Sequence, residues 1–183
     1  MNIEIRDAIP SDAEASLFVR YKAWLAIYPN AEHNITVEDI EERFKAQFSE
    51  EKLVELAEQI DTMKKNGRYV VAVVDEKIVG ICLLLREEDK SQLRSIYVLP
   101  EYQGKGIGKA LWNEVRKSID PDKDTFVDVA IYNTNAIGFY SNLGFKDTGR
   151  RFSNPRLTMK NGSVIPEMEM RLDKTKSKEA SSS

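Results

Sequence analysis

The sequence predicts an α/β protein of the α+β kind, in which amphipathic helices accompany a sheet. Short runs rich in β-branched residues, among them YVVAVV and IVGICLLL, have the length of strands and are bounded by turn residues. Longer segments between such runs carry apolar residues every three or four positions, as on one face of a helix. A chain of 183 residues can bury a substantial core, so we expect a single domain over residues 1–173.

The N-terminal third predicts one strand followed by three helices. Isoleucines alternate with charged residues over residues 2–9, which indicates a strand, and a Pro-Ser-Asp turn then opens a helix over residues 13–27. The sequence TVED resembles a capping box and begins a helix over residues 36–48. Residues 49–66 continue as an amphipathic helix that ends at Gly67.

Three consecutive strands follow. Residues 68–74 and 77–85 are β-branched runs separated by Asp75 and Glu76, which is the spacing of a tight hairpin. Residues 92–99 form a third run that is closed by a proline. We therefore expect an antiparallel meander.

The C-terminal part alternates helices and strands. Apolar residues from position 107 to 119 recur at helical spacing, and TFVDVAIY predicts a strand over residues 125–132. A short helix capped by Asn133 ends at a glycine, and strands are expected over residues 145–152 and 167–172.

Composition and charge exclude several classes of partner. A net charge of -3 with 31% charged residues gives no global field to hold nucleic acid or anionic lipid. The apolar runs fall short of the ~20 residues that span a bilayer, and no secretory signal opens the chain, so no membrane is expected. Cys82, the single cysteine, lies in an apolar run and predicts a buried thiol in a reducing, cytoplasmic setting. Residues 174–183, KTKSKEASSS, lack an apolar anchor and predict a disordered tail.

The stretch EYQGKGIGKAL, residues 101–111, places three glycines at alternate positions before a predicted helix. Glycines allow the backbone to approach a phosphate, and the free N–H groups of a helix N-terminus bind it. A Walker A loop would need one more residue between Gly104 and Gly108, and a Ser or Thr in place of Ala110. The dinucleotide fingerprint would need a glycine in place of Lys109. Both nucleotide motifs therefore fail, and Q-x-x-G-x-G remains.

At this point the chain resembles the GCN5-related N-acetyltransferases, the GNAT family. LRSIYVLPEYQGKGIGKAL matches the acetyl-CoA motif of that family, and NTNAIGFYSNLGF matches its second motif. The resemblance covers residues 68–170. It implies the GNAT fold, with a central mixed, mostly antiparallel sheet of about six to seven strands, and a splay between the strand that ends near Val98 and the strand over residues 125–132.

The resemblance also implies how acetyl-CoA is held. The diphosphate would bind the glycine loop, and the pantetheine arm would fill the splay, where the N–H of Val98 or of a neighbour would stabilise the oxyanion. The residues implied in binding the cofactor are Ile96, Tyr97, Val98, Gln103, Gly104, Lys105, Gly106, Ile107, Gly108, Lys109, Asn133 and Tyr140.

Two residues of the second motif have implied roles at the reacting end. Asn133 corresponds to the asparagine that caps its helix and contacts the pantetheine arm, although a cap alone would explain it. Tyr140 corresponds to the tyrosine whose hydroxyl lies on the coenzyme sulfur, where it can donate a proton to the departing thiolate. The alternative for Tyr140 is a core aromatic side chain.

The general base is left open by the sequence. The strand before the glycine loop begins Ser-Gln-Leu-Arg and offers no carboxylate where some relatives carry glutamate. Glu169 and Asp128 are possible substitutes, and either is also typical of a solvated strand face.

Residues of the variable regions could select the acceptor. Trp24, Tyr28 and His33 could line its pocket, although Trp24 also fits a core position and His33 an exposed loop. Arg150 and Arg151 could hold an anionic group of the acceptor, or could be solvated.

The sequence thus predicts a cytoplasmic acyltransferase that moves the acetyl group of acetyl-CoA to a primary amine by direct attack in a ternary complex. The alternative is a catalytically silent CoA-binding sensor or interaction module on the same fold. The sequence lacks the G-x-S-x-G motif that a serine hydrolase would need, and it lacks a His/Cys cluster that would indicate a metal site. The acceptor amine stays open, as does a homodimer, for which no segment marks an interface.

Overall fold

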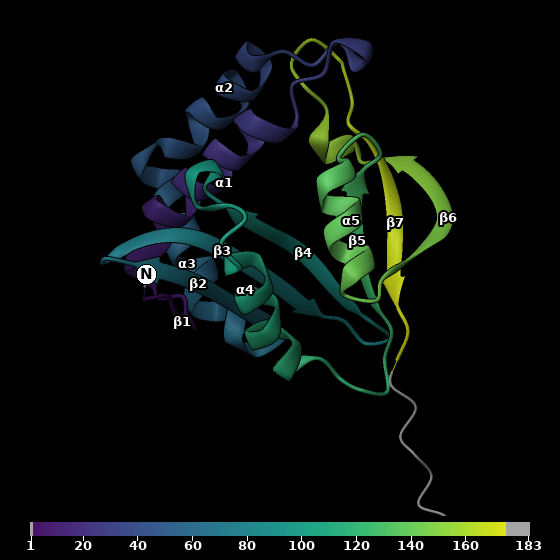
Figure 1. Ribbon diagram of the computed structural model, residues 1–183. Helices are drawn as coiled ribbons and strands as arrows, with labels where there is room; N and C mark the ends of the chain where they lie inside the picture. The colour runs from purple at the N-terminus through teal and green to yellow at the C-terminus, as the bar shows by residue number, and fades with distance from the viewer. Residues whose placement is uncertain (1, 175–183) are drawn as a thin grey trace, which may run out of the picture.

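The computed structural model describes residues 2–174 and contains a seven-stranded sheet with helices on both faces (Figure 1). The order of the strands is β1-β2-β3-β4-β5-β7-β6. The strands are β1 (Glu4–Asp7), β2 (Gly67–Val74), β3 (Lys77–Arg86), β4 (Ser91–Val98), β5 (Thr125–Ala130), β6 (Lys146–Ser153) and β7 (Pro166–Leu172). Of the predicted tail, residues 175–183 lie outside the described residues.

Five α-helices cover the sheet: α1 (Ala13–Ile27), α2 (Val37–Lys45), α3 (Glu50–Asn66), α4 (Ile107–Val115) and α5 (Thr134–Asn142). Helices α4 and α5 lie on one face of the sheet, and α1, α2 and α3 lie on the other (Figure 1). Within residues 2–174, every helix is too short or too polar to cross a lipid bilayer.

The predicted meander is confirmed. Strands β2, β3 and β4 pair antiparallel in succession. The β2–β3 turn places Asp75 at φ 48° and Glu76 at φ 64°, both in the left-handed region that a two-residue hairpin of this twist requires. The pairing of β4 with β5 is parallel, which makes the sheet mixed as predicted.

Strands β4 and β5 separate soon after they begin. Their pairing covers three positions only, from Ser91 opposite Thr125 to Leu93 opposite Val127. The register between β3 and β4 shifts at the same point, where Arg94 is the extra residue of a β-bulge. A bulge bends its strand and increases the local twist. The remainder of β4 therefore diverges from β5, and the predicted splay is present.

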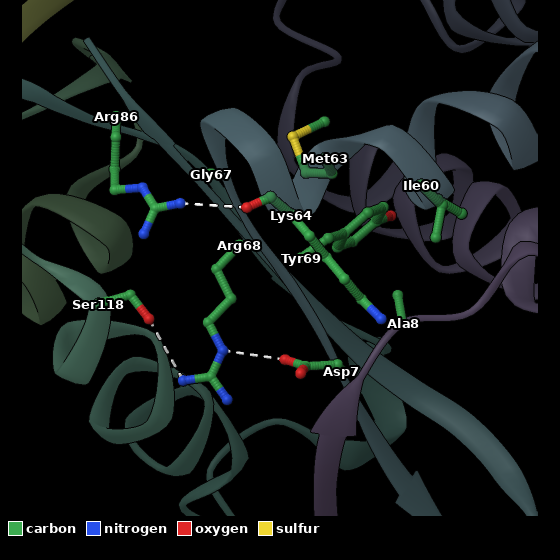
Figure 2. Close-up of a pocket in the computed structure, with 10 residues that line it drawn as sticks. All are labelled: Asp7, Ala8, Ile60, Met63, Lys64, Gly67, Arg68, Tyr69, Arg86 and Ser118. Atoms are coloured by element: carbon green, nitrogen blue, oxygen red, sulfur yellow. Dashed lines mark hydrogen bonds and ion pairs between the residues drawn. The ribbon is translucent and has the colours of Figure 1, made fainter. Parts of the chain in front are cut away.

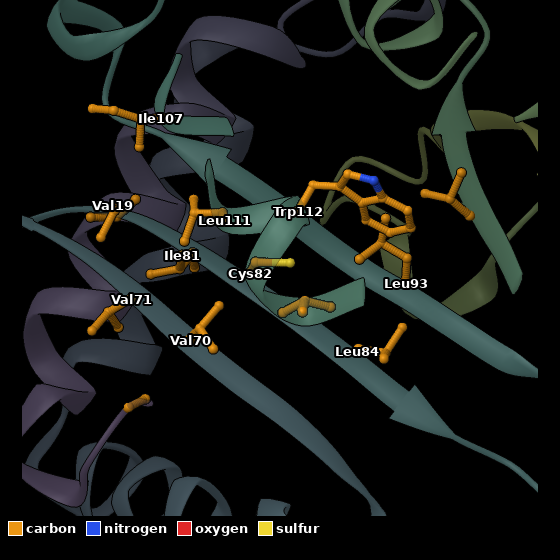
Figure 3. Packing of buried hydrophobic residues seen from close by; sticks show 14 of the residues in the cluster. Val19, Val70, Val71, Ile81, Cys82, Leu84, Leu93, Ile107, Leu111 and Trp112 are labelled. Carbon is orange, nitrogen blue, oxygen red and sulfur yellow. The ribbon is translucent and has the colours of Figure 1, made fainter. Parts of the chain in front are cut away.

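The main core lies between the sheet and the helices on its two faces. Val70, Cys82, Leu84 and Leu93 are buried in it, and the Trp112 ring of α4 covers them on one side (Figure 3). Cys82 is a free, fully buried thiol, as predicted. The core fixes the strands on both sides of the splay.

Several predicted boundaries were wrong by a few residues. The strand predicted to reach Tyr132 ends at Ala130, because the chain turns there: the N–H of Asn133 donates to the carbonyl of Ala130, 2.9 Å away. The helix expected over residues 36–48 ends at Lys45 and continues as a single 3-10 turn. The helix that follows the glycines ends at Val115 and likewise continues as a 3-10 turn, over Arg116–Ser118.

Candidate active site

The splay between β4 and β5 opens into a cleft of about 890 Å³. Its walls come from the end of α1, the second half of β4, the glycine loop, the first turn of α4, the end of β5 and one face of α5. Every residue predicted to bind the cofactor lines this cleft except Lys105. Two motifs about 30 residues apart in the chain thus meet at one site.

The backbone of β4 presents polar groups to the cleft. The N–H of Leu99 donates to the carbonyl of Val79 on β3, with an N to O distance of 2.9 Å. Because N–H groups alternate in direction along a strand, those of Ile96 and Val98 point away from β3 into the splay. This edge of β4 can therefore pair with an extended ligand as it would with another strand.

The glycine loop ends in a helix N-terminus without a side-chain cap. Gly104 and Gly106 have φ values of 72° and 83°, a region that favours glycine. Gly106 is the N-cap of α4 and offers no side-chain cap, and the first turn contains no acidic residue. The first N–H groups of a helix lack intrahelical partners, and the helix dipole adds positive potential there. The site is suited to an anion.

The other side chains of the loop differ in their roles. Gln103 Nε2 donates to the carbonyl of Val98 over 3.1 Å and ties the loop to β4. Lys105 Nζ donates to the carbonyl of Glu101, 2.9 Å away. A Cβ at Gly108 would lie 3.4 Å from the Phe139 ring, an ordinary van der Waals distance, so Gly108 lies where α4 packs against α5. Lys109, the other lysine of the loop region, lines the cleft.

Helix α5 contributes Asn133 and Tyr140 to the cleft. Asn133 Oδ1 accepts from the N–H of Ala136 over 3.1 Å, which is the predicted N-cap. Tyr140 is 6% exposed, and its ring packs edge-on against Phe139 and Phe145. Burial raises the pKa of Tyr140 well above its ordinary value, so the hydroxyl keeps its proton at neutral pH.

A cluster of aromatic side chains closes the end of the cleft near α1. Trp24 Nε1 donates to Tyr97 Oη over 3.1 Å, and the hydroxyls of Tyr28 and Tyr97 are 3.2 Å apart. Tyr28 and Tyr132 line the cleft, whereas Trp24 is buried in the core beneath α2. His33 stacks on Tyr132 with ring centroids 5.2 Å apart. Of the three residues considered for the acceptor pocket, Tyr28 borders the cleft directly.

The two carboxylates considered as bases are in different environments. Asp128 lines the cleft, where burial and then the charge of Glu169 raise its pKa, and Gln92 Nε2 donates to it over 3.2 Å. Glu169 is ion-paired with Arg150 at 2.8 Å and accepts from Thr148 Oγ1 at 3.1 Å. Glu169 thus already has partners.

The arginine pair considered for acceptor binding is held by acidic neighbours on β6 and β7. Arg150 is the partner of Glu169, and Arg151 Nη2 lies 2.6 Å from Asp147 Oδ2. These ion pairs account for both guanidinium groups.

Glu167 is a residue of this region that the sequence did not single out. It is 7% exposed, it lies opposite Ala130 in the β5–β7 register, and its Oε2 has no hydrogen-bond partner among residues 2–174. Burial and then the charge of Asp128 raise its pKa to about 7, against the opposing charge of Arg94. The alternation in PEMEM indicates that Glu167 and Glu169 share a face, but not which one is buried.

The raised pKa of Glu167 has a consequence for stability. In the unfolded chain this carboxyl ionises near its ordinary pKa of about 4.3, whereas in the folded protein it keeps its proton up to about pH 7. The free energy of unfolding therefore falls as the pH rises between those two values. With allowance for solvent screening, Glu167→Gln should raise Tm by roughly 5 °C at pH 8 and change it little at pH 4.5. Thermal unfolding followed by circular dichroism at both pH values measures this. An equal change at both would contradict it.

A smaller cavity of about 190 Å³ between α3 and β2 has a structural explanation. Figure 2 shows Arg68 bonded to Asp7 and to Ser118, and Arg86 bonded to the carbonyl of Lys64. Arg68 also pairs with Glu114 of α4 at 2.7 Å. These contacts join β1, β2 and α4. The two arginines beside the cavity therefore already have hydrogen-bond partners.

Together, the anion site and the open edge of β4 define a class of protein. An extended carrier with phosphate at one end and a thioester at the other fits a helix N-terminus followed by an unpaired strand edge, which describes an acyltransferase that uses a coenzyme A thioester. The chain belongs to the GNAT acetyltransferase family: the family model described as "Acetyltransferase (GNAT) domain" matches residues 30–172. It is an acetyl-CoA-dependent N-acetyltransferase.

Curated relatives act on different amines. The chain is 28% identical to the spermidine N(1)-acetyltransferase of Thermoplasma acidophilum, over 80% of this chain and 89% of that protein. It is 34% identical to the peptidyl-lysine N-acetyltransferase YjaB of Salmonella typhimurium, over 52% of this chain and 62% of that one.

Solved structures confirm the fold. The PaiA N-acetyltransferase of Thermoplasma acidophilum, solved in complex with coenzyme A, is 25% identical and superimposes with a TM-score of 0.69 over 94% of this chain and all of its own. The ribosomal-protein-S18-alanine N-acetyltransferase of Escherichia coli shares the fold at 18% identity, with a TM-score of 0.63 over 98% of each chain.

Proposed function

We propose that this protein transfers the acetyl group of acetyl-CoA to a primary amine by direct attack in a ternary complex. The observation that carries the proposal is the uncapped N-terminus of α4 beside the open edge of β4. The free N–H groups of Ile107, Gly108 and Lys109 bind the diphosphate, and the Lys109 ammonium adds a positive charge at the same place.

The pantetheine arm runs along β4 in the space where β5 diverges. Its amides pair with the N–H and carbonyl groups of Ile96 as in a β-ladder, and the amide side chain of Asn133 borders it from the other side. The thioester carbonyl then lies near the N–H of Val98, which stabilises the oxyanion. A donor of this kind contributes about 3 kcal/mol where it has been measured.

Tyr140 supplies the proton for the leaving thiolate. Tyr140 lines the same cleft, and its buried hydroxyl is neutral throughout the working pH range. Burial also raises the pKa of a thiol formed beside Tyr140, so the buried site raises the pKa of the proton donor and of the proton acceptor alike. Transfer from oxygen to sulfur completes the departure of coenzyme A.

The acceptor is a cationic primary amine, and a polyamine is the first candidate. Two observations support this choice. The cleft contains the carboxylate of Asp128, with Glu167 adjacent to it, and the curated relative that this chain matches over 80% of its length is named for spermidine.

A coenzyme assay with an amine panel tests the proposed function. The purified protein is incubated with acetyl-CoA and, separately, with spermidine, a lysine-containing peptide and a peptide with an N-terminal alanine, while free thiol is measured. We expect thiol release that depends on the amine, with spermidine the best acceptor. Binding of coenzyme A by calorimetry without turnover on any amine would instead favour a silent CoA-binding module on the same fold.

A further inference from the structure

One side chain beside the cleft is a buried carboxylate with an unsatisfied oxygen. Glu167 is 7% exposed, and its Oε2 has no hydrogen-bond partner among residues 2–174. Buried polar atoms in proteins are nearly always paired, so such an oxygen indicates a ligand or a bound water. We propose that Glu167 accepts the proton that the acceptor ammonium loses before attack, either directly or through a bound water, an inference that rests on the proposed function.

The strand register places Glu167 on the acceptor side of the sheet. It lies opposite Ala130, which lines the cleft, and shares a sheet face with Asp128, two positions earlier in β5. The neighbouring Met168 points to the opposite face, where it joins the core beneath α5. Glu167 therefore faces the end of the cleft that is closed by α1, away from α4 and the diphosphate site.

Charged and titratable groups of several elements surround this carboxylate. They are Asp128 on β5, Arg94 on β4, Tyr97 on β4, Tyr28 after α1 and Tyr132 after β5. Tyr132 lines the cleft, and burial and then the charge of Glu167 raise its pKa to about 12. An ammonium bound among these tyrosines would lie in the field of Glu167.

The protonation behaviour of Glu167 suits a base at neutral pH. Burial and the charge of Asp128 raise its pKa to about 7, whereas an unperturbed glutamate near 4.3 would be a far weaker acceptor for an ammonium proton. The other carboxylates here have partners: Asp128 accepts from Gln92, and Glu169 is held by Arg150 and Thr148. Among the residues that the structure describes, Glu167 is the carboxylate that combines burial with an unpaired side-chain oxygen.

The proton balance is complete without a further reagent. The ammonium gives one proton to the Glu167 carboxylate, and the neutral amine attacks the thioester carbon. The C–S bond breaks as Tyr140 gives its proton to the thiolate. The nitrogen then carries two protons, of which one restores Tyr140 and the other stays on the amide. Glu167 then releases its proton to solvent, so one proton leaves for each acetyl group transferred.

The pH dependence of kcat/KM with spermidine and acetyl-CoA tests this role. The wild-type protein should show an acidic limb near pH 7, because Glu167 must be ionised to accept the proton. Glu167→Gln should lower kcat at pH 7.5 by about 100-fold, and kcat/KM should then rise about tenfold per pH unit towards the pKa of the amine. Glu167→Asp should recover part of the rate. The matched control, Glu169→Gln on the same strand and face, should keep the wild-type profile.

Two further variants separate Glu167 from its neighbours. The acidic limb should move to lower pH in Asp128→Asn, which removes a like charge, and to higher pH in Arg94→Gln, which removes an opposing one. A limb that survives in Glu167→Gln and vanishes in Asp128→Asn would overturn the proposal and make Asp128 the proton acceptor. The far-ultraviolet circular dichroism of each variant shows whether it is folded. If the wild-type protein acetylated no amine, the proposed function would fail, whereas an active wild type with an unchanged Glu167→Gln profile would remove only this inference.

Discussion

Replacing Tyr140 with phenylalanine should lower kcat by at least tenfold and leave the KM for acetyl-CoA close to its wild-type value. Tyr140 lines the cleft; the substitution removes only its hydroxyl, and the ring keeps its contacts with Phe139 and Phe145. Without that proton source the thiolate must leave as an anion in a largely buried site, and the rate falls by roughly 10–100-fold. Steady-state kinetics with spermidine and acetyl-CoA, together with thermal unfolding, measure both properties.

A tyrosine outside the cleft provides the control for this variant. Tyr21 of α1 packs against Phe44 and Phe48, so Tyr21→Phe should retain wild-type kinetics. If Tyr140→Phe were equally active, Tyr140 would have no part in the mechanism, and the role of a core aromatic side chain would explain its burial.

Replacing Gly106 with aspartate should weaken the binding of coenzyme A by about 100-fold. A Cβ at this position meets no atom within 4 Å, so the substitution causes no clash at Cβ and its steric cost is the backbone strain at φ 83°. The new carboxylate would lie at the N-terminus of α4, where it would repel the diphosphate and compete for the same N–H groups. Calorimetric titration with coenzyme A measures the loss.

Gly106→Asn is the matched control for charge. Asparagine has the same shape and imposes about the same backbone cost at φ 83°, of order 1 kcal/mol, but carries no charge. We expect its affinity for coenzyme A to lie within about tenfold of wild type. Equal losses in the two variants would show that backbone strain, and not charge, weakens binding. Unchanged binding in both variants would mean that the diphosphate lies elsewhere.

Local sequence patterns were sufficient for the elements and for the two motifs. The meander follows from β-branched runs of strand length, and the Asp75–Glu76 turn follows from their two-residue separation. The uncapped start of α4 follows from the alternating glycines, and the cap of α5 follows from Asn133. Such features depend on residues within a few positions of one another, which is why sequence reasoning recovers them.

The boundaries were less accurate because distant contacts decide where an element ends. The β5 strand stops at Ala130, where the chain turns into α5 and the pairing with β7 also ends. Gly108 was expected to serve the phosphate, and the structure also places it beside Phe139 of α5, which no local pattern indicates.

The sequence by itself determined the elements of this protein, their order and the anion-binding loop, because hydrophobic period, turn residues and caps act over a few neighbouring positions. Tertiary structure alone decided which carboxylate is buried and unpaired. In PEMEM, Glu167 and Glu169 are equivalent in pattern. They differ because Arg150 of β6 pairs with Glu169, while Glu167 lies buried between Ala130 of β5 and Phe152 of β6. The pKa of a carboxyl group depends on its desolvation and on charges from distant parts of the chain, which come together only when the protein folds.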